Sequence, residues 1–144
     1  MATILVVDDE CTVRSLLHDV LEIEGYVVRE AEDGPTALSD MHELRPDLVI
    51  LDVMMPRMSG IEVLTEIRQD PELGLLPVLM LTAAGDDDTT WAGWQAGAST
   101  YIDKPFDHAT LLGWIEHLLA DSRLRAENVS DIPSQRVYEL AEAV

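Results

Sequence analysis

The stretch Asp47-Leu48-Val49-Ile50-Leu51-Asp52-Val53-Met54-Met55-Pro56 decides the fold predicted for this chain. It opens with an apolar run over 48–51, whose length is typical of a strand buried on both faces of a parallel sheet. Asp52 follows where that strand should end, and Pro56 blocks any extension. Ligands bind outside the carboxyl ends of such strands. Asp52 is therefore a first candidate site residue, although one acid opening a loop is equally typical of solvated surface.

Four further apolar runs flank this strand, and helical segments lie between them. We expect strands at 4–7, 26–28, 48–51, 77–81 and 100–102. Apolar residues at helical spacing indicate helices that begin near Val13, Pro35, Ser59, Asp86 and Asp107. Strands that alternate with helices predict an α/β fold, in which a five-stranded parallel sheet carries helices on both faces.

The alternation ends near Ala120, which sets the expected domain organisation. Residues 1–120 are predicted to form one domain, and residues 121–144 a polar C-terminal extension that acts as a tail or linker. A break at Ile132-Pro133 precedes a candidate short helix over 134–143. The chain is then either a stand-alone module or the first part of a longer protein.

The composition of the chain argues against some classes of function. The formal net charge is -19, from 28 acids and 9 bases, which argues against direct nucleic-acid binding because phosphate contacts need clustered Lys and Arg. We find no membrane-length apolar run and no signal peptide, so a cytoplasmic location without membrane contact is expected. The single cysteine, Cys11, is interpreted as a buried, inert thiol.

Polar side chains follow four of the five predicted strands. Asp8 and Asp9 come after the first strand, Asp52 after the third, Thr82 after the fourth and Lys104 after the fifth. The carboxyl ends of parallel strands share one edge of the sheet. Three carboxylates, a hydroxyl and an ammonium group should therefore converge there.

Converging carboxylates need a cation between them. Two like charges about 4 Å apart repel by about 4 kcal/mol at an effective dielectric near 20. Mg²⁺ takes carboxylate oxygens and completes its coordination with water and phosphate. A carboxylate can also attack a phosphoryl group. The pattern indicates that Asp52 is the nucleophile, that Asp8 and Asp9 hold the metal, and that Lys104 and Thr82 stabilise the transferred charge.

These motifs resemble the response-regulator receiver domain of two-component signalling, of the chemotaxis-regulator type. The resemblance covers about residues 2–120 and rests on Val6-Val7-Asp8-Asp9-Glu10, Leu51 to Pro56 with Ser59-Gly60, Leu81-Thr82-Ala83, and Ala96-Gly97-Ala98 through Tyr101 to Lys104-Pro105-Phe106. Each motif is weak alone, and the four together are specific. The resemblance implies a flavodoxin-like strand order, 2-1-3-4-5.

The resemblance also implies residue roles. Asp52 would take a phosphoryl group from a phosphohistidine on a sensor histidine kinase or phosphotransfer protein. Mg²⁺, or Mn²⁺ in its place, would be held by Asp8, Asp9, Asp52 and the backbone carbonyl of Met54. Lys104 would pair with the phosphoryl group, and the Lys104–Pro105 peptide bond would be cis.

A conformational switch completes what the resemblance implies. Thr82 would move toward the phosphoryl group and Tyr101 would follow, which alters the surface of the fourth helix, fifth strand and fifth helix. A downstream protein or a homodimer would use that surface, and exposed Trp94 or Trp114 would contribute to it. The protein would be no enzyme beyond catalysing its own phosphorylation and dephosphorylation. With Met54 and Ala84 as flanking side chains, we expect a long-lived phosphoryl state.

Other interpretations of these residues and of the function stay open. Tyr101 is also typical of plain core packing. A phosphorylation-independent interaction module would use the same fold. A phosphatase with an aspartyl intermediate would need a second acid at position 54, where this chain has methionine. A flavin-binding carrier would need a phosphate loop after the first strand, where Asp8-Asp9-Glu10 would repel phosphate.

Overall fold

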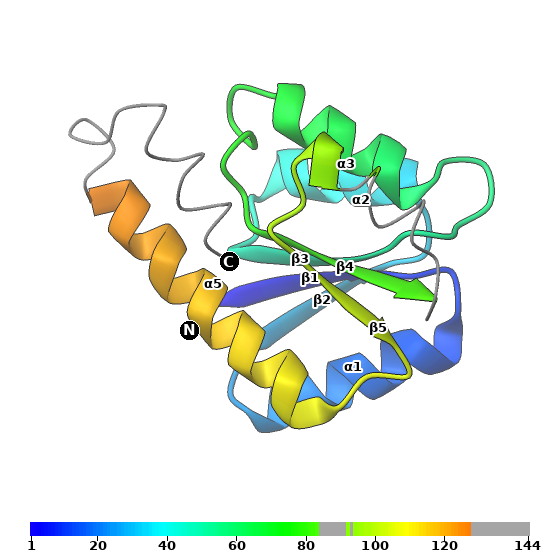
Figure 1. The fold of residues 1–144 in the computed structure, drawn as a ribbon, viewed down its shortest axis with the longest axis vertical. Coiled ribbons are helices and arrows are strands. Elements are labelled where there is room, and N and C mark those ends of the chain that lie inside the picture. Colours follow the sequence, from blue (N-terminus) through cyan, green and yellow to red (C-terminus); the bar gives the residue numbers. More distant parts are fainter. Residues whose placement is uncertain (84–91, 93, 128–144) are drawn as a thin grey trace.

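Figure 1 shows the computed structural model, which describes residues 1–83, 92 and 94–127, with the backbone alone for residues 123–127. The elements run in the order β1 (Thr3–Val7), α1 (Cys11–Ile23), β2 (Val27–Ala31), α2 (Gly34–Glu43), β3 (Leu48–Asp52), α3 (Gly60–Gln69), β4 (Val78–Ala83), β5 (Thr100–Lys104) and α5 (His108–Glu127). The fourth predicted helix is described only at Ala92 and at 94–96, which are helical. Asp86, Trp91 and the candidate helix over 134–143 lie outside the described residues.

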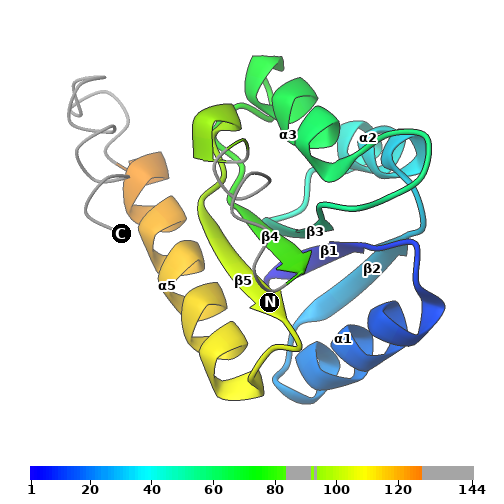
Figure 2. The same cartoon turned by 45° about the vertical axis from the view of Figure 1, so that its right-hand side comes forward.

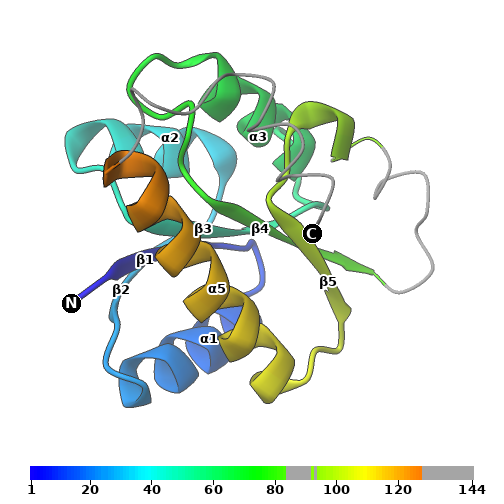
Figure 3. The same ribbon diagram turned by 60° about the vertical axis from the view of Figure 1, so that its left-hand side comes forward.

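The five strands form one parallel sheet in the order β2-β1-β3-β4-β5, which confirms the predicted fold class and strand order. Helices α1 and α5 cover one face, and α2 and α3 cover the other (Figure 2). Figure 3 shows the same two layers with the left-hand side of Figure 1 turned forward. Covered on both faces, the β3 segment Leu48–Asp52 is buried at every position.

Successive strand residues point to opposite faces and so divide the buried side chains between two cores. Leu5, Val7, Val49 and Leu51 face α2 and α3. Ile4, Val6, Leu48 and Ile50 face α1 and α5. Both sets are closed to solvent, because each apolar helix face lies against them. These two cores hold the strands in register and thereby fix the positions of the residues at their ends.

The predicted helix starts have local causes that the structure makes explicit. The Ser59 side chain accepts a hydrogen bond from the Glu62 amide at 3.2 Å and caps α3. Asp33 accepts one from the Thr36 amide at 2.8 Å and caps α2, with Pro35 in its first turn. Helix α1 is followed by Gly25 with a φ of 95°, a left-handed conformation that glycine adopts without steric cost.

Two sequence expectations differ from the structure. Four strands continue beyond their apolar runs, because backbone pairing does not require apolar side chains: β2 ends at Ala31, β3 at Asp52, β4 at Ala83 and β5 at Lys104. The expectation of a buried Cys11 is wrong. Cys11 is exposed at the first residue of α1, where its side chain lies outside the apolar stripe that buries Leu17 and Leu21.

None of the helices that the structure describes is long and apolar enough to cross a membrane.

An ion pair between His42, near the end of α2, and Asp70, after α3, predicts pH-dependent stability. His42 Nε2 lies 2.6 Å from Asp70 Oδ2. This hydrogen bond raises the pKa of His42 and lowers that of Asp70. A raised histidine pKa adds stability below the ordinary value near 6.5, and this gain is lost as pH rises through the folded-state pKa. We therefore expect His42→Ala to lower the free energy of unfolding more at pH 6 than at pH 8.5.

Urea unfolding at the two pH values measures this difference. Asp70→Asn supplies the control, because without the carboxylate the His42→Ala change should cost nearly the same at both values. An equal loss at pH 6 and pH 8.5 in the parent protein would contradict the prediction.

Candidate functional site at the carboxyl edge of the sheet

Strand register brings the first two carboxylates of the site together. Val7 is paired with Leu51 across β1 and β3, so the residues that follow, Asp8 and Asp52, lie side by side. A backbone hydrogen bond fixes the position of Asp8, since its amide donates to the Ala31 carbonyl at 3.2 Å. Both acids are buried, with exposed fractions of 0% and 4%. Two like charges therefore face each other in a region with little solvent to screen them.

Lys104 lies between these carboxylates. Its Nζ is 3.1 Å from Asp8 Oδ2 and 3.3 Å from Asp52 Oδ1, and it is 4.0 Å from Glu10 Oε1. The side chain reaches the pair from the last residue of β5, directly before the Lys104–Pro105 peptide bond, which is cis as the family resemblance implied. One ammonium group thus offsets part of the charge of three acids, and the site retains a net negative charge.

The remaining charge imbalance affects the protonation of Asp52. Burial, with the neighbouring Asp8 carboxylate, raises the pKa of Asp52 to about 6, although Lys104 opposes the shift. Desolvation by itself would lower the pKa of Lys104, but its contacts with Asp8 and Asp52 outweigh this and raise it. The lysine therefore stays charged at neutral pH, while a bound cation or a proton would further stabilise the acid pair.

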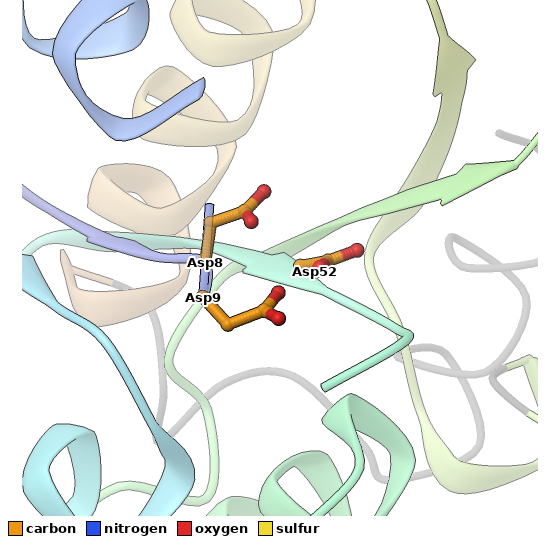
Figure 4. A group of neighbouring side chains, drawn as sticks. All are labelled: Asp8, Asp9 and Asp52. Atoms are coloured by element: carbon orange, nitrogen blue, oxygen red, sulfur yellow. The ribbon is translucent and has the colours of Figure 1, made fainter. Parts of the chain in front are cut away.

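Asp9 completes a group that could hold a metal ion. The carboxylates of Asp8, Asp9 and Asp52 each offer an oxygen within 4.8 Å of the others. Figure 4 shows the three side chains gathered at one edge of the sheet, two from the end of β1 and one from the end of β3. Asp9 is exposed, so the group opens to solvent on that side. Clustered carboxylate oxygens with an open side fit Mg²⁺, which keeps several of its waters.

Thr82 and Tyr101 lie on β4 and β5, the two strands that follow β3 in the order of the sheet, and they differ in their surroundings. Thr82 follows Leu81, the partner of Asp52 in the sheet, and its hydroxyl donates to the Ala83 carbonyl at 3.4 Å. Tyr101 lies on β5 and packs in part against the core beneath α2 and α3. Burial raises the pKa of Tyr101 to about 12, which keeps the phenol neutral. The structure thus places Thr82 at the edge and Tyr101 further along the neighbouring strand.

Trp94 packs against Tyr101, with ring centroids 5.4 Å apart and planes inclined by 50°. Its exposed fraction is 39%, which confirms the expectation that Trp94 is partly exposed. Trp114 is half-buried beside the core beneath α1 and α5, and its ring meets His117 edge-on. Met54 is exposed next to the site, whereas Ala84 lies outside the described residues.

Sequence reasoning missed two residues that support the site. Arg14 donates to the Asp8 backbone carbonyl at 2.7 Å, a contact that no motif indicated because arginines in a first helical turn are common. Gly60 was expected only as part of the start of α3. In the structure a side chain at this position would overlap the Asp52 carbonyl oxygen, so the glycine sets how closely α3 approaches β3.

The raised pKa of Asp52 predicts that Asp52→Asn stabilises the metal-free protein. An acid whose pKa is higher in the folded state destabilises the fold when it ionises, and this cost grows as pH rises from about 4 to about 6. With EDTA at pH 7, Asp52→Asn should raise the free energy of unfolding by about 2 kcal/mol. The gain should shrink at pH 5 and vanish near pH 4.

Urea titrations of both proteins across this pH range provide the test. Glu66→Gln, on the exposed face of α3, removes the same charge far from the site and should change little. A less stable Asp52→Asn protein at pH 7 would contradict the account of charge at this site.

Comparison with known proteins agrees with this fold. Residues 4–116 match the family model of the response regulator receiver domain. The chain is 38% identical to the phosphate regulon transcriptional regulatory protein PhoB of Pseudomonas aeruginosa, over 81% of this chain and 51% of that one. It is 41% identical to the response regulator MprA of Mycobacterium ulcerans, over 96% of this chain and 59% of that one.

Solved structures give the same result. The chemotaxis protein CheY4 of Vibrio cholerae superposes with a TM-score of 0.77 and 35% identity, covering 82% of this chain and 98% of that chain. The receiver domain of NtrX from Brucella abortus gives 0.76 and 35%, covering 81% and 98%. The fold is thus that of a receiver domain. The chain belongs to the response regulator receiver domain family of two-component systems. It spans about half the length of the curated relatives named here.

Proposed function

We propose that this chain is a phospho-acceptor module in which Asp52 receives a phosphoryl group from a histidine kinase or phosphotransfer protein. The observation that carries the proposal is the position of Lys104, whose ammonium contacts Asp8 and Asp52 at 3.1 and 3.3 Å with Asp9 beside them. The burial of two acids beside a single lysine does not by itself stabilise the fold. Its arrangement suits the transfer of a phosphoryl group, which brings negative charge next to the lysine.

The transfer itself is a displacement at phosphorus. A carboxylate oxygen of Asp52 forms the new O–P bond, and the P–N bond of the phosphohistidine breaks. The leaving imidazole keeps the electron pair of that bond and takes up a proton. Lys104 then donates to a phosphoryl oxygen, and the Thr82 hydroxyl can exchange its contact with the Ala83 carbonyl for another.

The residues that would hold Mg²⁺ are Asp8, Asp9, Asp52 and the backbone carbonyl of Met54, with Mn²⁺ as an alternative ion. The group of three carboxylates with one exposed member is consistent with such a site. When bound, the ion supplies positive charge that offsets the acids and the phosphoryl oxygens. Asp8 and Asp9 would hold the cation together with Asp52, whose second carboxylate oxygen would be available for the attack.

A switch of Thr82 and Tyr101 would carry the signal to the surface. The Trp94 ring packs against Tyr101 at a centroid distance of 5.4 Å, so a movement of the phenol ring would change this contact with the partly exposed indole. The altered surface would comprise β5, α5 and the fourth helix, where a downstream protein or a second copy would bind. Some curated relatives are named as transcriptional regulators, a role that belongs to longer proteins of which this chain covers 51% and 55%. Within this acidic chain, output through protein contacts rather than direct nucleic-acid contact is proposed.

The proposed domain covers residues 1–120, followed by a tail over 121–144. The family match ends at residue 116, while the described part of α5 continues to Glu127. The last helix therefore crosses the proposed boundary, and the tail would begin as its extension.

Intact mass after incubation with a small acyl phosphate tests the function. In the presence of Mg²⁺ the protein should gain the mass of one phosphoryl group, and with EDTA it should gain none. Asp52→Asn should show no gain under either condition, whereas Asp19→Asn, an exposed acid on α1, should behave as the parent. No gain in the parent protein would favour a phosphorylation-independent interaction module on the same fold.

A further inference from the structure

Arg14 connects α1 to the peptide between the first two acids of the site. Its Nη1 donates to the Asp8 backbone carbonyl at 2.7 Å, from the first turn of α1. The arginine is mostly buried, with 15% of its side chain exposed. A guanidinium so enclosed has little freedom to move away from its acceptor, so the Asp8 carbonyl is fixed in direction.

Asp9 depends on this peptide more than Asp8 does. The Asp8 carboxylate is anchored on both oxygens, by the Glu10 amide at 2.9 Å and by Lys104 Nζ at 3.1 Å. The Asp9 carboxylate makes no hydrogen bond or ion pair with any residue that the structure describes. Its direction is therefore set by the backbone. The peptide unit is planar, so a donor on the Asp8 carbonyl also fixes the orientation of the Asp9 amide and α-carbon.

Two further side chains hold the guanidinium in place. Arg14 Nε pairs with Glu30 Oε1 at 3.3 Å, and the other oxygen of Glu30 lies 2.9 Å from His18 Nδ1. The second ring nitrogen of His18 contacts Glu22 at 2.8 Å. Glu30 is thus fixed on both oxygens, and β2, which carries it, is paired to β1 immediately before the site.

We propose that Arg14 is a positioning residue for metal binding: it fixes the Asp8–Asp9 peptide so that both carboxylates face Asp52. This inference rests on the proposed function, because it concerns the same Mg²⁺ site. Groups that orient metal ligands from outside the coordination shell commonly change metal affinity by 10- to 100-fold. Arg14 would do so through the backbone and would not touch the metal or the phosphoryl group.

The sign of the effect separates positioning from simple electrostatics. Arg14 carries a positive charge near a cation site, so the loss of that charge alone would make Mg²⁺ bind more tightly. The loss of a positioning contact has the opposite result, because Asp9 would then sample directions away from the site. The two explanations predict changes in opposite directions for the same substitution.

Calorimetric titration of the metal-free protein with Mg²⁺ provides the direct measurement. Arg14→Met should weaken Mg²⁺ binding about tenfold. Arg14→Lys keeps the positive charge and a hydrogen-bond donor, so it should weaken Mg²⁺ binding less than Arg14→Met does. It replaces Arg14→Met in this test if that variant fails to fold. In acyl-phosphate reactions the Mg²⁺ concentration for half-maximal rate should rise by the same factor, with a much smaller change at saturating Mg²⁺.

Arg45→Met is the matched control. It removes the same charge from an arginine that donates to the Glu72 carbonyl, and it should leave Mg²⁺ affinity within about twofold of the parent. Unchanged or tighter binding by both Arg14 variants would overturn the inference, as would an equal weakening by Arg45→Met. If the parent protein binds no Mg²⁺, the inference and the metal site of the proposed function both fail. If the parent protein binds Mg²⁺ and Arg14→Met binds it equally well, only the inference fails, and the metal site of the proposed function stands.

Discussion

Gly60→Ala is expected to lower the free energy of unfolding by about 3 kcal/mol, among the largest losses from a single substitution in this chain. A β-carbon at this position would overlap the carbonyl oxygen of Asp52 and crowd the α-carbon of Val53. Both are backbone atoms of β3 and its continuation, so no side chain can rotate to make room. Helix α3 would have to move away from the strand.

The clash also breaks local hydrogen bonds. The Gly60 amide donates to the Val53 carbonyl at 2.9 Å, and Ser59 caps the first turn of α3. A shift of α3 stretches the first of these bonds and opens the core around Val63 and Leu64, which are fully buried. Because the carbonyl that the new β-carbon would overlap belongs to Asp52, the position of this site residue should also change.

Chemical denaturation followed by circular dichroism measures this loss. Gly113→Ala is the matched control, since nothing lies within 4 Å of a β-carbon there. Within α5, alanine should be neutral or stabilise the protein by up to about 1 kcal/mol. A Gly60→Ala protein as stable as the parent would show that α3 can shift without cost.

Lys104→Met is expected to destabilise the metal-free protein by about 3 kcal/mol at pH 7, because it leaves two buried carboxylates without their shared cation. The loss should be smaller in Mg²⁺ than in EDTA, since a bound cation replaces part of the missing charge. Acceptance of a phosphoryl group should fall by about 100-fold or more, because the transferred charge loses its partner.

A double-mutant cycle separates this charge effect from lost packing. Asp52→Asn removes one of the two stranded carboxylates, so in that background Lys104→Met should cost about half as much or less. Urea unfolding of the four proteins in EDTA gives the coupling. If the two changes in the free energy of unfolding were strictly additive, the lysine would stabilise the fold through its aliphatic chain and not through the acids.

The sequence was sufficient to predict the fold and most of the candidate site. Five apolar runs separated by helical segments indicated a parallel sheet, and the order β2-β1-β3-β4-β5 agrees with the order that the family resemblance implied. Polar residues at strand ends converge for a geometric reason, because all strands point the same way. Asp8, Asp9, Asp52 and Lys104 could thus be grouped without knowledge of any distance, whereas their chemical roles remain predictions.

Other features follow from contacts between different elements of the fold, and only the tertiary structure decided them. The position of Lys104 between two acids, the donation from Arg14 to the Asp8 carbonyl and the clearance at Gly60 depend on how helices pack onto the sheet. The exposure of Cys11 and the contact of Trp94 with Tyr101 have the same origin. Local pattern determines which residues face a core or end a strand. Atomic contacts between elements require the packing of the whole domain, because even partners close in sequence, such as Asp52 and Gly60, lie on different elements whose relative placement the local pattern does not give.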